Sequence, residues 1–144
     1  MIDSQRLESI VSEAGRIAYD LWPGAGNALD AWEKKPGDPV CEADLAVDAF
    51  LKRELGALLP SAGWLSEETA DDPARLGHDL IWLVDPVDGT RDFIRGRSGW
   101  AVNSKVRPPQ LRPPPRQCLV EQRRDGGRRG DARKKSEWWA EGRR

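Results

Sequence analysis

The spacing of apolar residues predicts two amphipathic helices in the first sixty residues. In the first helix, apolar side chains recur every three or four residues and form one face: Leu7, Ile10, Val11, Ala14, Ile17, Ala18 and Leu21. Asp3 or Ser4 can cap its start, and Pro23-Gly24 ends it. We expect the second helix over about residues 42–59, with an apolar face made of Val47, Leu51, Leu55 and Leu58. Between the helices, residues 25–39 contain several Gly and Pro and predict turns around a short element that holds Trp32.

Short apolar runs after the helices predict strands. Residues 63–66 form a candidate strand that leads to Glu67-Glu68. Residues 80–84 are a continuous apolar run, typical of a strand covered on both faces, and this run leads to Asp85. Phe93-Ile94 and residues 100–102 indicate further strands of the same sheet. The fold class is therefore α/β.

Residues 103–144 lack any such pattern. Residues 1–102 carry 10 Lys and Arg against 19 Asp and Glu, whereas residues 103–144 carry 13 against 5. The formal net charge of −1 is thus the sum of an acidic part and a basic, Arg/Pro/Gly-rich part. A segment with so few apolar residues cannot bury enough surface to offset the entropy of ordering it. We expect a folded unit over 1–102 and a disordered basic tail over 103–144.

Composition also limits the cellular setting. The sequence has no apolar run of about 18 residues and no charged-then-apolar leader, so we expect no membrane span. Cys41 and Cys118 lie far apart and match no metal or redox spacing. A cytoplasmic location is the expectation.

Carboxylates follow two predicted strands. Glu67 follows the first and Asp85 the second, and ligands of open α/β sheets collect beyond the carboxyl ends of the strands. Asp88 comes three residues after Asp85, and carboxylate oxygens are the ligands that Mg²⁺ prefers. Two such ions, about 3.5–4 Å apart, would clamp the oxygens of a phosphoryl transfer. Gly89 lets backbone N–H groups approach a phosphate, and Thr90 can orient a water.

Each of these features also has an ordinary structural explanation. Paired glutamates are usually part of a solvated loop, and Asp88-Gly89 is a common turn pair. Asp44 at a helix start can simply compensate the helix dipole, and Cys41 can be a small packed residue. The arginines of the tail could bind nucleic acid, but no base-stacking pattern accompanies them, so we do not expect that partner. Composition alone leaves the chemistry open.

Three blocks of the sequence resemble one family. Residues 82–90 (Trp-Leu-Val-Asp-Pro-Val-Asp-Gly-Thr) resemble the signature of the inositol monophosphatase family of Mg²⁺-dependent, lithium-sensitive phosphatases. Residues 38–44 and 64–69 are similar to two further family blocks in the same order and spacing. Lys34 or Lys35 stands where the family has a loop lysine. The likeness covers about residues 1–102.

The resemblance implies the N-terminal half of a layered α/β sandwich and a role for each site residue. Glu67, Asp85 and the carbonyl of Val87 would bind a first Mg²⁺, and Asp85 with Asp88 a second. Gly89 and Thr90 would present backbone amides to the phosphate of the substrate. Thr90 with Glu67 would activate water for direct attack on phosphorus, without a phosphoenzyme, and Asp44 would act from the outer shell.

The substrate is a small phosphorylated molecule on this interpretation. Residues 64–69 and 89–93 are more similar to the 3′(2′),5′-bisphosphate nucleotidase branch, which hydrolyses adenosine 3′,5′-bisphosphate. An inositol-1-phosphate phosphatase is the alternative, although it more usually has Asn where Asp92 stands. A non-enzymatic fragment, or a nucleic-acid binder that uses the basic tail, is the competing class. The oligomeric state stays open.

Two departures from the family pattern matter. Cys41 replaces the usual Thr or Ser. After Val102 the family continues into a second half, whose Trp-Asp motif completes the second metal site, and residues 103–144 contain no Trp-Asp pair. We therefore expect little or no activity from this chain. A frameshift would explain the change, because Arg, Pro and Gly have GC-rich codons. An uninterrupted reading frame around the codon for Asn103, with no family-like continuation in either neighbouring frame, would contradict that hypothesis.

Overall fold

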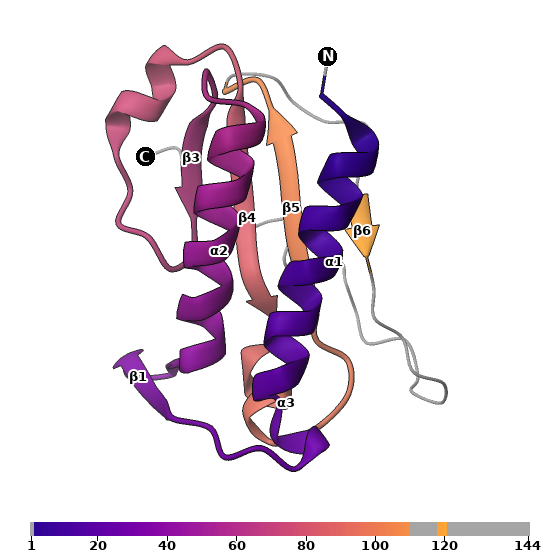
Figure 1. Cartoon of the computed structure of the whole chain (residues 1–144). Helices are drawn as coiled ribbons and strands as arrows, with labels where there is room; N and C mark the ends of the chain where they lie inside the picture. Colours follow the sequence, from indigo (N-terminus) through magenta and orange to yellow (C-terminus); the bar gives the residue numbers. More distant parts are fainter. Residues whose placement is uncertain (1, 110–117, 121–144) are drawn as a thin grey trace.

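The fold is a pair of helices packed on one face of a sheet. The computed structural model describes residues 2–109 and 118–120. Helices α1 (Ser4–Leu21) and α2 (Glu42–Leu58) lie side by side against the sheet (Figure 1). The α/β class and both predicted helices are confirmed.

The sheet has the order β3-β4-β5-β6. Strand β3 (Gly63–Ser66) runs parallel to β4 (Ile81–Asp88), and β5 (Ala101–Arg107) and β6 (Cys118–Val120) extend the sheet in antiparallel pairing. A separate hairpin of β1 (Ala31–Lys35) and β2 (Asp38–Cys41) precedes α2. Two 3-10 turns, η1 (Pro23–Ala25) and η2 (Pro73–Gly77), and the short helix α3 (Thr90–Ile94) complete the described elements.

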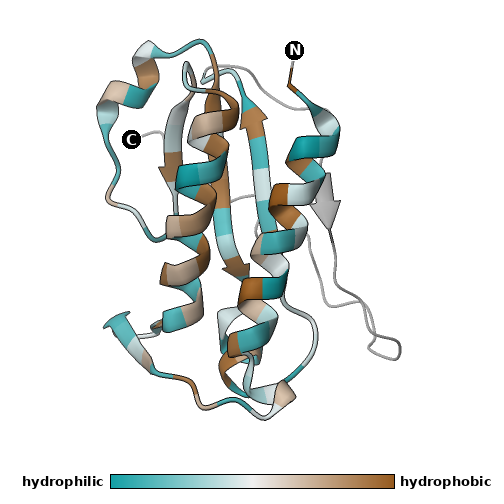
Figure 2. Cartoon of the chain, in the orientation of Figure 1, coloured by the Kyte–Doolittle hydropathy of each residue, from teal (hydrophilic) through white to brown (hydrophobic). Residues whose placement is uncertain are grey.

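The core lies between the helices and the sheet. The predicted apolar faces of α1 and α2 turn toward the strands, and Figure 2 shows the apolar residues of β4 behind them. Trp82 and Val84 of β4 and Leu51 of α2 are almost fully buried. Burial of each such side chain stabilises the fold by about 1.5–3 kcal/mol. The predicted strand is confirmed, and it is longer than expected, because β4 continues through Asp85 to Asp88.

The helix starts follow the predicted chemistry. Asp3 caps α1, where its Oδ1 accepts hydrogen bonds from the backbone N–H groups of Gln5 (3.0 Å) and Arg6 (3.1 Å). Helix α2 begins directly after β2, with Cys41 at its N-cap. Residues 38–44, one of the three family-like blocks, therefore form the junction between the β1–β2 hairpin and α2.

Two expectations are wrong. Phe93-Ile94 lies in α3 and not in a strand, because the chain turns at Gly89 and buries the Phe93 ring edge-on against Trp100, with ring centroids 5.0 Å apart. Residues 103–107 are not disordered, because they form most of β5, where Asn103 pairs with Asp85 and Arg107 with Ile81. A backbone ladder needs no apolar side chains, so composition misjudged this segment. The expectation for 110–117 and 121–144 lies outside the described residues.

Candidate functional site

The carboxyl ends of β3 and β4 bring Glu67 and Asp85 onto adjacent strands. Ser66 pairs with Val84 in parallel register, and the N–H of Glu67 donates to the carbonyl of Val84 (3.3 Å). Asp85 is buried, with 5% of its surface exposed. Pairing between β4 and β5 shifts between Asp85 and Asp88, where Pro86 has no N–H to give to the ladder.

Gly89 turns the chain from β4 into α3. Its φ of +90° belongs to the left-handed region, and a Cβ there would meet the carbonyl oxygen of Gly99 at 3.3 Å. The turn places the Thr90 hydroxyl 2.9 Å from the carbonyl oxygen of Val87 and 3.1 Å from Oδ1 of Asp44. The single hydroxyl proton is shared between these two acceptors.

Asp44 reaches this hydroxyl from the first turn of α2. It is 1% exposed, and its Oδ2 accepts hydrogen bonds from the backbone N–H (2.9 Å) and the thiol (3.1 Å) of Cys41. Burial raises the pKa of Asp44, while the hydrogen bonds from Cys41 and Thr90 oppose that shift. Burial and the Asp44 carboxylate raise the pKa of Cys41 to about 12, so this thiol is a packed hydrogen-bond donor and not a nucleophile.

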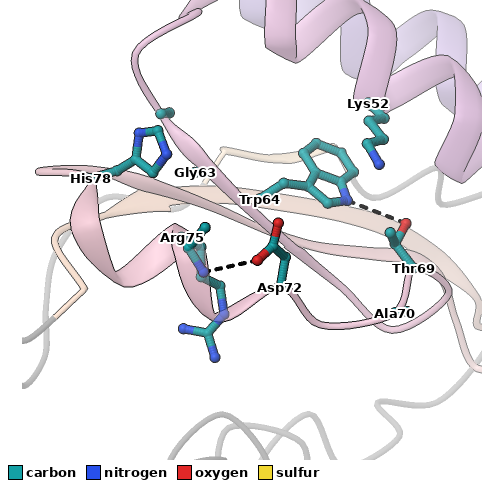
Figure 3. Close-up of a pocket in the computed structure, with 10 residues that line it drawn as sticks. Lys52, Gly63, Trp64, Thr69, Ala70, Asp72, Arg75 and His78 are labelled. Carbon is teal, nitrogen blue, oxygen red and sulfur yellow. Dashed lines mark hydrogen bonds between the residues drawn. The ribbon is translucent and has the colours of Figure 1, made fainter.

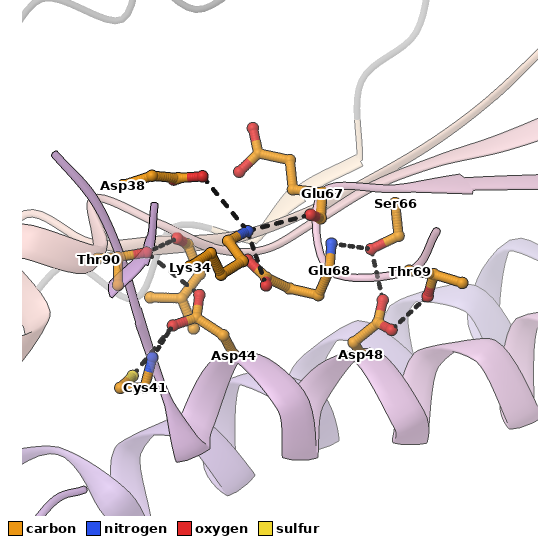
Figure 4. Close-up of polar contacts among 11 residues, drawn as sticks. Lys34, Asp38, Cys41, Asp44, Asp48, Ser66, Glu67, Glu68, Thr69 and Thr90 are labelled. Atoms are coloured by element: carbon orange, nitrogen blue, oxygen red, sulfur yellow. Dashed lines mark hydrogen bonds and ion pairs between the residues drawn. The ribbon is translucent and has the colours of Figure 1, made fainter. Parts of the chain in front are cut away.

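Lys34 of β1 approaches the Glu67–Glu68 turn from outside (Figure 4). Its Nζ donates to the carbonyl oxygen of Glu67 (3.3 Å) and to Oε2 of Glu68 (3.0 Å). Burial raises the pKa of Glu68, although the ion pair with Lys34 opposes the shift. Partial burial acts to lower the pKa of Lys34, but Glu68 and the other nearby carboxylates outweigh it and raise the value. Of the two candidate lysines, Lys34 contacts the turn.

The predicted metal-binding side chains offer the oxygen atoms that Mg²⁺ prefers, but in the structure they do not converge into a complete metal site. Glu67, Asp85 and Asp88 offer only hard oxygen ligands. Within residues 2–109 and 118–120, however, no three His, Cys, Asp or Glu side chains converge closely enough to hold a metal ion. Thr90, Asp44 and the Val87 carbonyl are in hydrogen-bond contact. The three carboxylates predicted to bind metal lie at the same end of the β3–β4 pair without forming such a cluster.

Lys105 is a neighbour of these aspartates that the sequence did not reveal. Burial and the charge of Arg107 lower the pKa of Lys105, while Asp88 and Asp85 oppose that shift. An ammonium group near both aspartates partly balances their charge. The alternation of Asn103, Lys105 and Arg107 along β5 could have indicated it, because alternate residues share one face of a strand.

A second group of polar side chains, also missed, joins α2 to the Glu67–Glu68 turn. Asp48 accepts hydrogen bonds from the hydroxyls of Ser66 (2.5 Å) and Thr69 (2.7 Å). Its spacing of four residues from Asp44 could have placed it on the same helix face.

A pocket of about 260 Å³ lies beside β3, away from the predicted residues (Figure 3). Trp64, Lys52, Arg75 and His78 are among its lining. The Arg75 guanidinium is held by Asp71 through two contacts of 2.6 and 2.9 Å. Since no sequence-predicted site residue lines this pocket, the candidate site is the β3–β4 edge.

Comparison with known proteins places the chain. Residues 4–103 match the profile of the Inositol monophosphatase family. The 3′-phosphoadenosine 5′-phosphate phosphatase of Mycobacterium bovis is 48% identical over 61 residues, which are 42% of this chain and 23% of that protein. The histidinol-phosphatase of Chlorobaculum parvum is 31% identical over 94 residues, covering 65% of this chain and 35% of the relative.

The solved structures agree with the sequence relatives. The extragenic suppressor protein SuhB of Bartonella henselae superposes with a TM-score of 0.64 at 27% identity, over 72% of this chain and 40% of that one. The chain thus spans two fifths or less of each of these proteins. In the described part of the chain, no helix has the length and apolar character of a membrane span. On the family profile and these relatives, the chain belongs to the inositol monophosphatase family.

Proposed function

We propose that this chain carries the metal- and phosphate-binding side of a magnesium-dependent phosphomonoesterase. The observation that carries the proposal is the Thr90 hydroxyl, which lies between the Asp44 carboxylate and the Val87 carbonyl, directly after Asp85 and Asp88. A hydroxyl held in this way is oriented by two acceptors that lie 46 and 3 residues away in the sequence.

In this proposal Glu67, Asp85 and the Val87 carbonyl hold one Mg²⁺, and Asp85 with Asp88 a second. Bound Mg²⁺ would supply Lewis-acid polarisation of the phosphoryl group. The Val87 carbonyl oxygen has a second lone pair besides the one that Thr90 uses. Of the three carboxylates, Asp85 is the most enclosed, so its charge would have the most to gain from a cation.

The chain's own residues would orient the water and the phosphate. While Thr90 donates to Asp44, its oxygen can accept a hydrogen bond from the attacking water. As the water oxygen bonds to phosphorus and the ester P–O bond breaks, the Glu67 carboxylate would take the proton that this water gives up, and the leaving alkoxide would take a proton from solvent. The backbone N–H groups of Gly89 and Thr90, at the left-handed turn into α3, would donate to phosphate oxygens.

We propose adenosine 3′,5′-bisphosphate as the substrate and the cytoplasm as the location. The similarity to the mycobacterial 3′-phosphoadenosine 5′-phosphate phosphatase, together with the residues after Gly89, supports the nucleotidase branch. Inositol-1-phosphate is the alternative.

Metal binding and phosphate release test the proposal together. The purified chain is titrated with Mn²⁺, a paramagnetic substitute for Mg²⁺, and assayed for phosphate release from adenosine 3′,5′-bisphosphate with Mg²⁺. Asp79→Asn, at an exposed aspartate just before β4, is the matched control for Asp85→Asn. We expect Mn²⁺ binding by the parent chain and Asp79→Asn, and its loss in Asp85→Asn.

Turnover is the secondary measurement, because we expect little or none from this chain alone. Any phosphate release should disappear in Asp85→Asn and in the presence of a chelator. Mn²⁺ binding that survives Asp85→Asn, or hydrolysis that survives the chelator, would contradict the proposal. Salt-sensitive binding of nucleic acid that survives Asp85→Asn would instead support the non-enzymatic alternative.

A further inference from the structure

We propose that Asp48 is a positioning residue, which holds the Glu67–Glu68 turn in place and thereby sets where Glu67 can bind a metal ion. The inference rests on the proposed function for the role of Glu67. It concerns a side chain of α2 that lies outside the family-type blocks of the sequence. Its evidence is a set of directed hydrogen bonds to a buried carboxylate.

Asp48 grips the turn at both ends. Ser66 is the last residue of β3, and Thr69 follows three residues later, so their hydroxyls flank Glu67 and Glu68. The Ser66 hydroxyl donates to Oδ1 of Asp48 (2.5 Å), and the Thr69 hydroxyl donates to Oδ2 (2.7 Å) (Figure 4). The two oxygens of one carboxylate thus fix two points of the same short segment.

Each hydroxyl also accepts a hydrogen bond from an N–H group, so its own proton is available to donate to Asp48. The N–H of Glu68 donates to the Ser66 hydroxyl (3.2 Å), and the indole N–H of Trp64 donates to the Thr69 hydroxyl (3.4 Å). Both hydroxyl protons are therefore committed to Asp48. Hydrogen bonds to a charged acceptor are about twice as strong as neutral ones, and networks of this kind specify one arrangement.

Burial makes any other position of the turn unfavourable. Asp48 is 8% exposed and Ser66 is 4% exposed. If the turn moved away, it would leave a buried carboxylate without its hydroxyl donors, and water has little access to replace them. Lys34 holds the outer side of the turn through the carbonyl of Glu67. The turn is thus fixed from the helix side and from the hairpin side.

Helix α2 links the hydrogen bonds of Asp48 to the phosphate side of the site. Asp44 and Asp48 are four residues apart, so they lie on one helix face about 6 Å apart along the axis. Asp44 accepts from Thr90, and Asp48 accepts from the ends of the Glu67–Glu68 turn. One turn of α2 therefore sets the separation of Thr90 and Glu67, the pair assigned to the water.

The experiment is a double-mutant cycle on the full chain. Mn²⁺ dissociation constants are measured for the parent, Asp48→Asn, Glu67→Gln and the double variant, with Asp20→Asn, an exposed aspartate at the end of α1, as the control. We expect Asp48→Asn to weaken Mn²⁺ binding about tenfold, as loss of a group that orients a ligand does. In the Glu67→Gln background the same change should have no further effect, because Asp48 acts through Glu67.

A second readout reports on the turn itself. The amide hydrogen of Glu68 should exchange faster in Asp48→Asn, while amides in the middle of β4 keep their parent rates. Thr69→Ala removes one arm of the network and leaves the acceptor of the Glu68 N–H in place, so it repeats the test if Asp48→Asn does not fold.

The outcomes separate the two proposals. Unchanged Mn²⁺ affinity in Asp48→Asn, or an equal loss with and without Glu67, overturns the positioning role. If the parent chain shows no Mn²⁺ binding that Glu67→Gln alters, the proposed metal centre is overturned instead. Glu68 exchange then decides the inference alone: faster exchange supports the grip on the turn, and unchanged exchange overturns it.

Discussion

Two buried serines allow a direct test of what hydrogen bonding contributes in this sheet. Ser66 in β3 is 4% exposed and Ser104 in β5 is 2% exposed. The Ser66 hydroxyl donates to Asp48 and accepts from the N–H of Glu68. The Ser104 hydroxyl has no hydrogen-bond partner among the residues that the structure describes. The perturbation is the same Ser→Ala change at each position.

The expected effects have opposite signs. Ser66→Ala removes a hydrogen bond to a charged acceptor and strands a partly buried N–H, so the free energy of unfolding should fall by about 2–3 kcal/mol. Ser104→Ala removes a hydroxyl whose desolvation is uncompensated, so the free energy should rise by about 1 kcal/mol. Both variants lose the same oxygen atom from a buried site. The volume terms therefore nearly cancel in the comparison.

Urea unfolding followed by tryptophan fluorescence measures the difference. With a denaturant slope of about 1.5 kcal/mol per molar, the two midpoints should differ by roughly 2 M, with Ser104→Ala the more stable. Equal slopes in the two variants would show that the comparison concerns stability and not the unfolded state. A fall in stability for Ser104→Ala, or equal shifts in both variants, would refute the reasoning.

Three further predictions concern the site. Gly89→Ala should lower the free energy of unfolding by about 1–2 kcal/mol, because position 89 has a positive φ and a nearby carbonyl. Gly56→Ala, in an open position of α2, should raise the free energy of unfolding by about 1 kcal/mol, and similar urea midpoints for the two variants would contradict this. Because burial raises the pKa of Asp44 above 3.8, its folded form holds a proton that the unfolded form releases, so the parent loses stability as pH rises through that window. The free energy of unfolding of the parent should therefore fall relative to that of Asp44→Asn as the pH rises above 3.8, and urea midpoints that keep a constant difference would contradict it. In a Cys118→Ser background, Cys41 should resist a maleimide at about pH 7.5 until urea unfolds the chain, and rapid labelling of the folded chain would contradict its burial and its pKa of about 12.

The parts of the fold that could be predicted are those encoded by neighbouring residues. Helix α1 has an apolar face at helical spacing and an N-cap at Asp3, and both signals lie within one segment. Phe93 had no such signal, because its burial depends on the turn at Gly89 and on the distant ring of Trp100. The predicted strand ends at residue 102, whereas β5 continues to Arg107. Its pairing with β4 is a property of the backbone, which side-chain composition does not report.

The same distinction between local signals and distant contacts explains which features of the site could be predicted. The sequence block from Trp82 to Thr90 predicts which residues carry oxygen ligands, because they follow one another along a single strand and turn. It cannot predict the distances between blocks, which in the structure are linked by two carboxylates of helix α2. Asp44 bridges 46 residues to Thr90, and Asp48 bridges 18 residues to Ser66. Acidic residues at helical spacing on a buried helix face were therefore the available signal for positioning. Their hydroxyl partners outside the helix, which are Thr90 for Asp44 and Ser66 with Thr69 for Asp48, distinguish this pair from carboxylates that merely compensate a helix dipole, since a dipole needs no such partner.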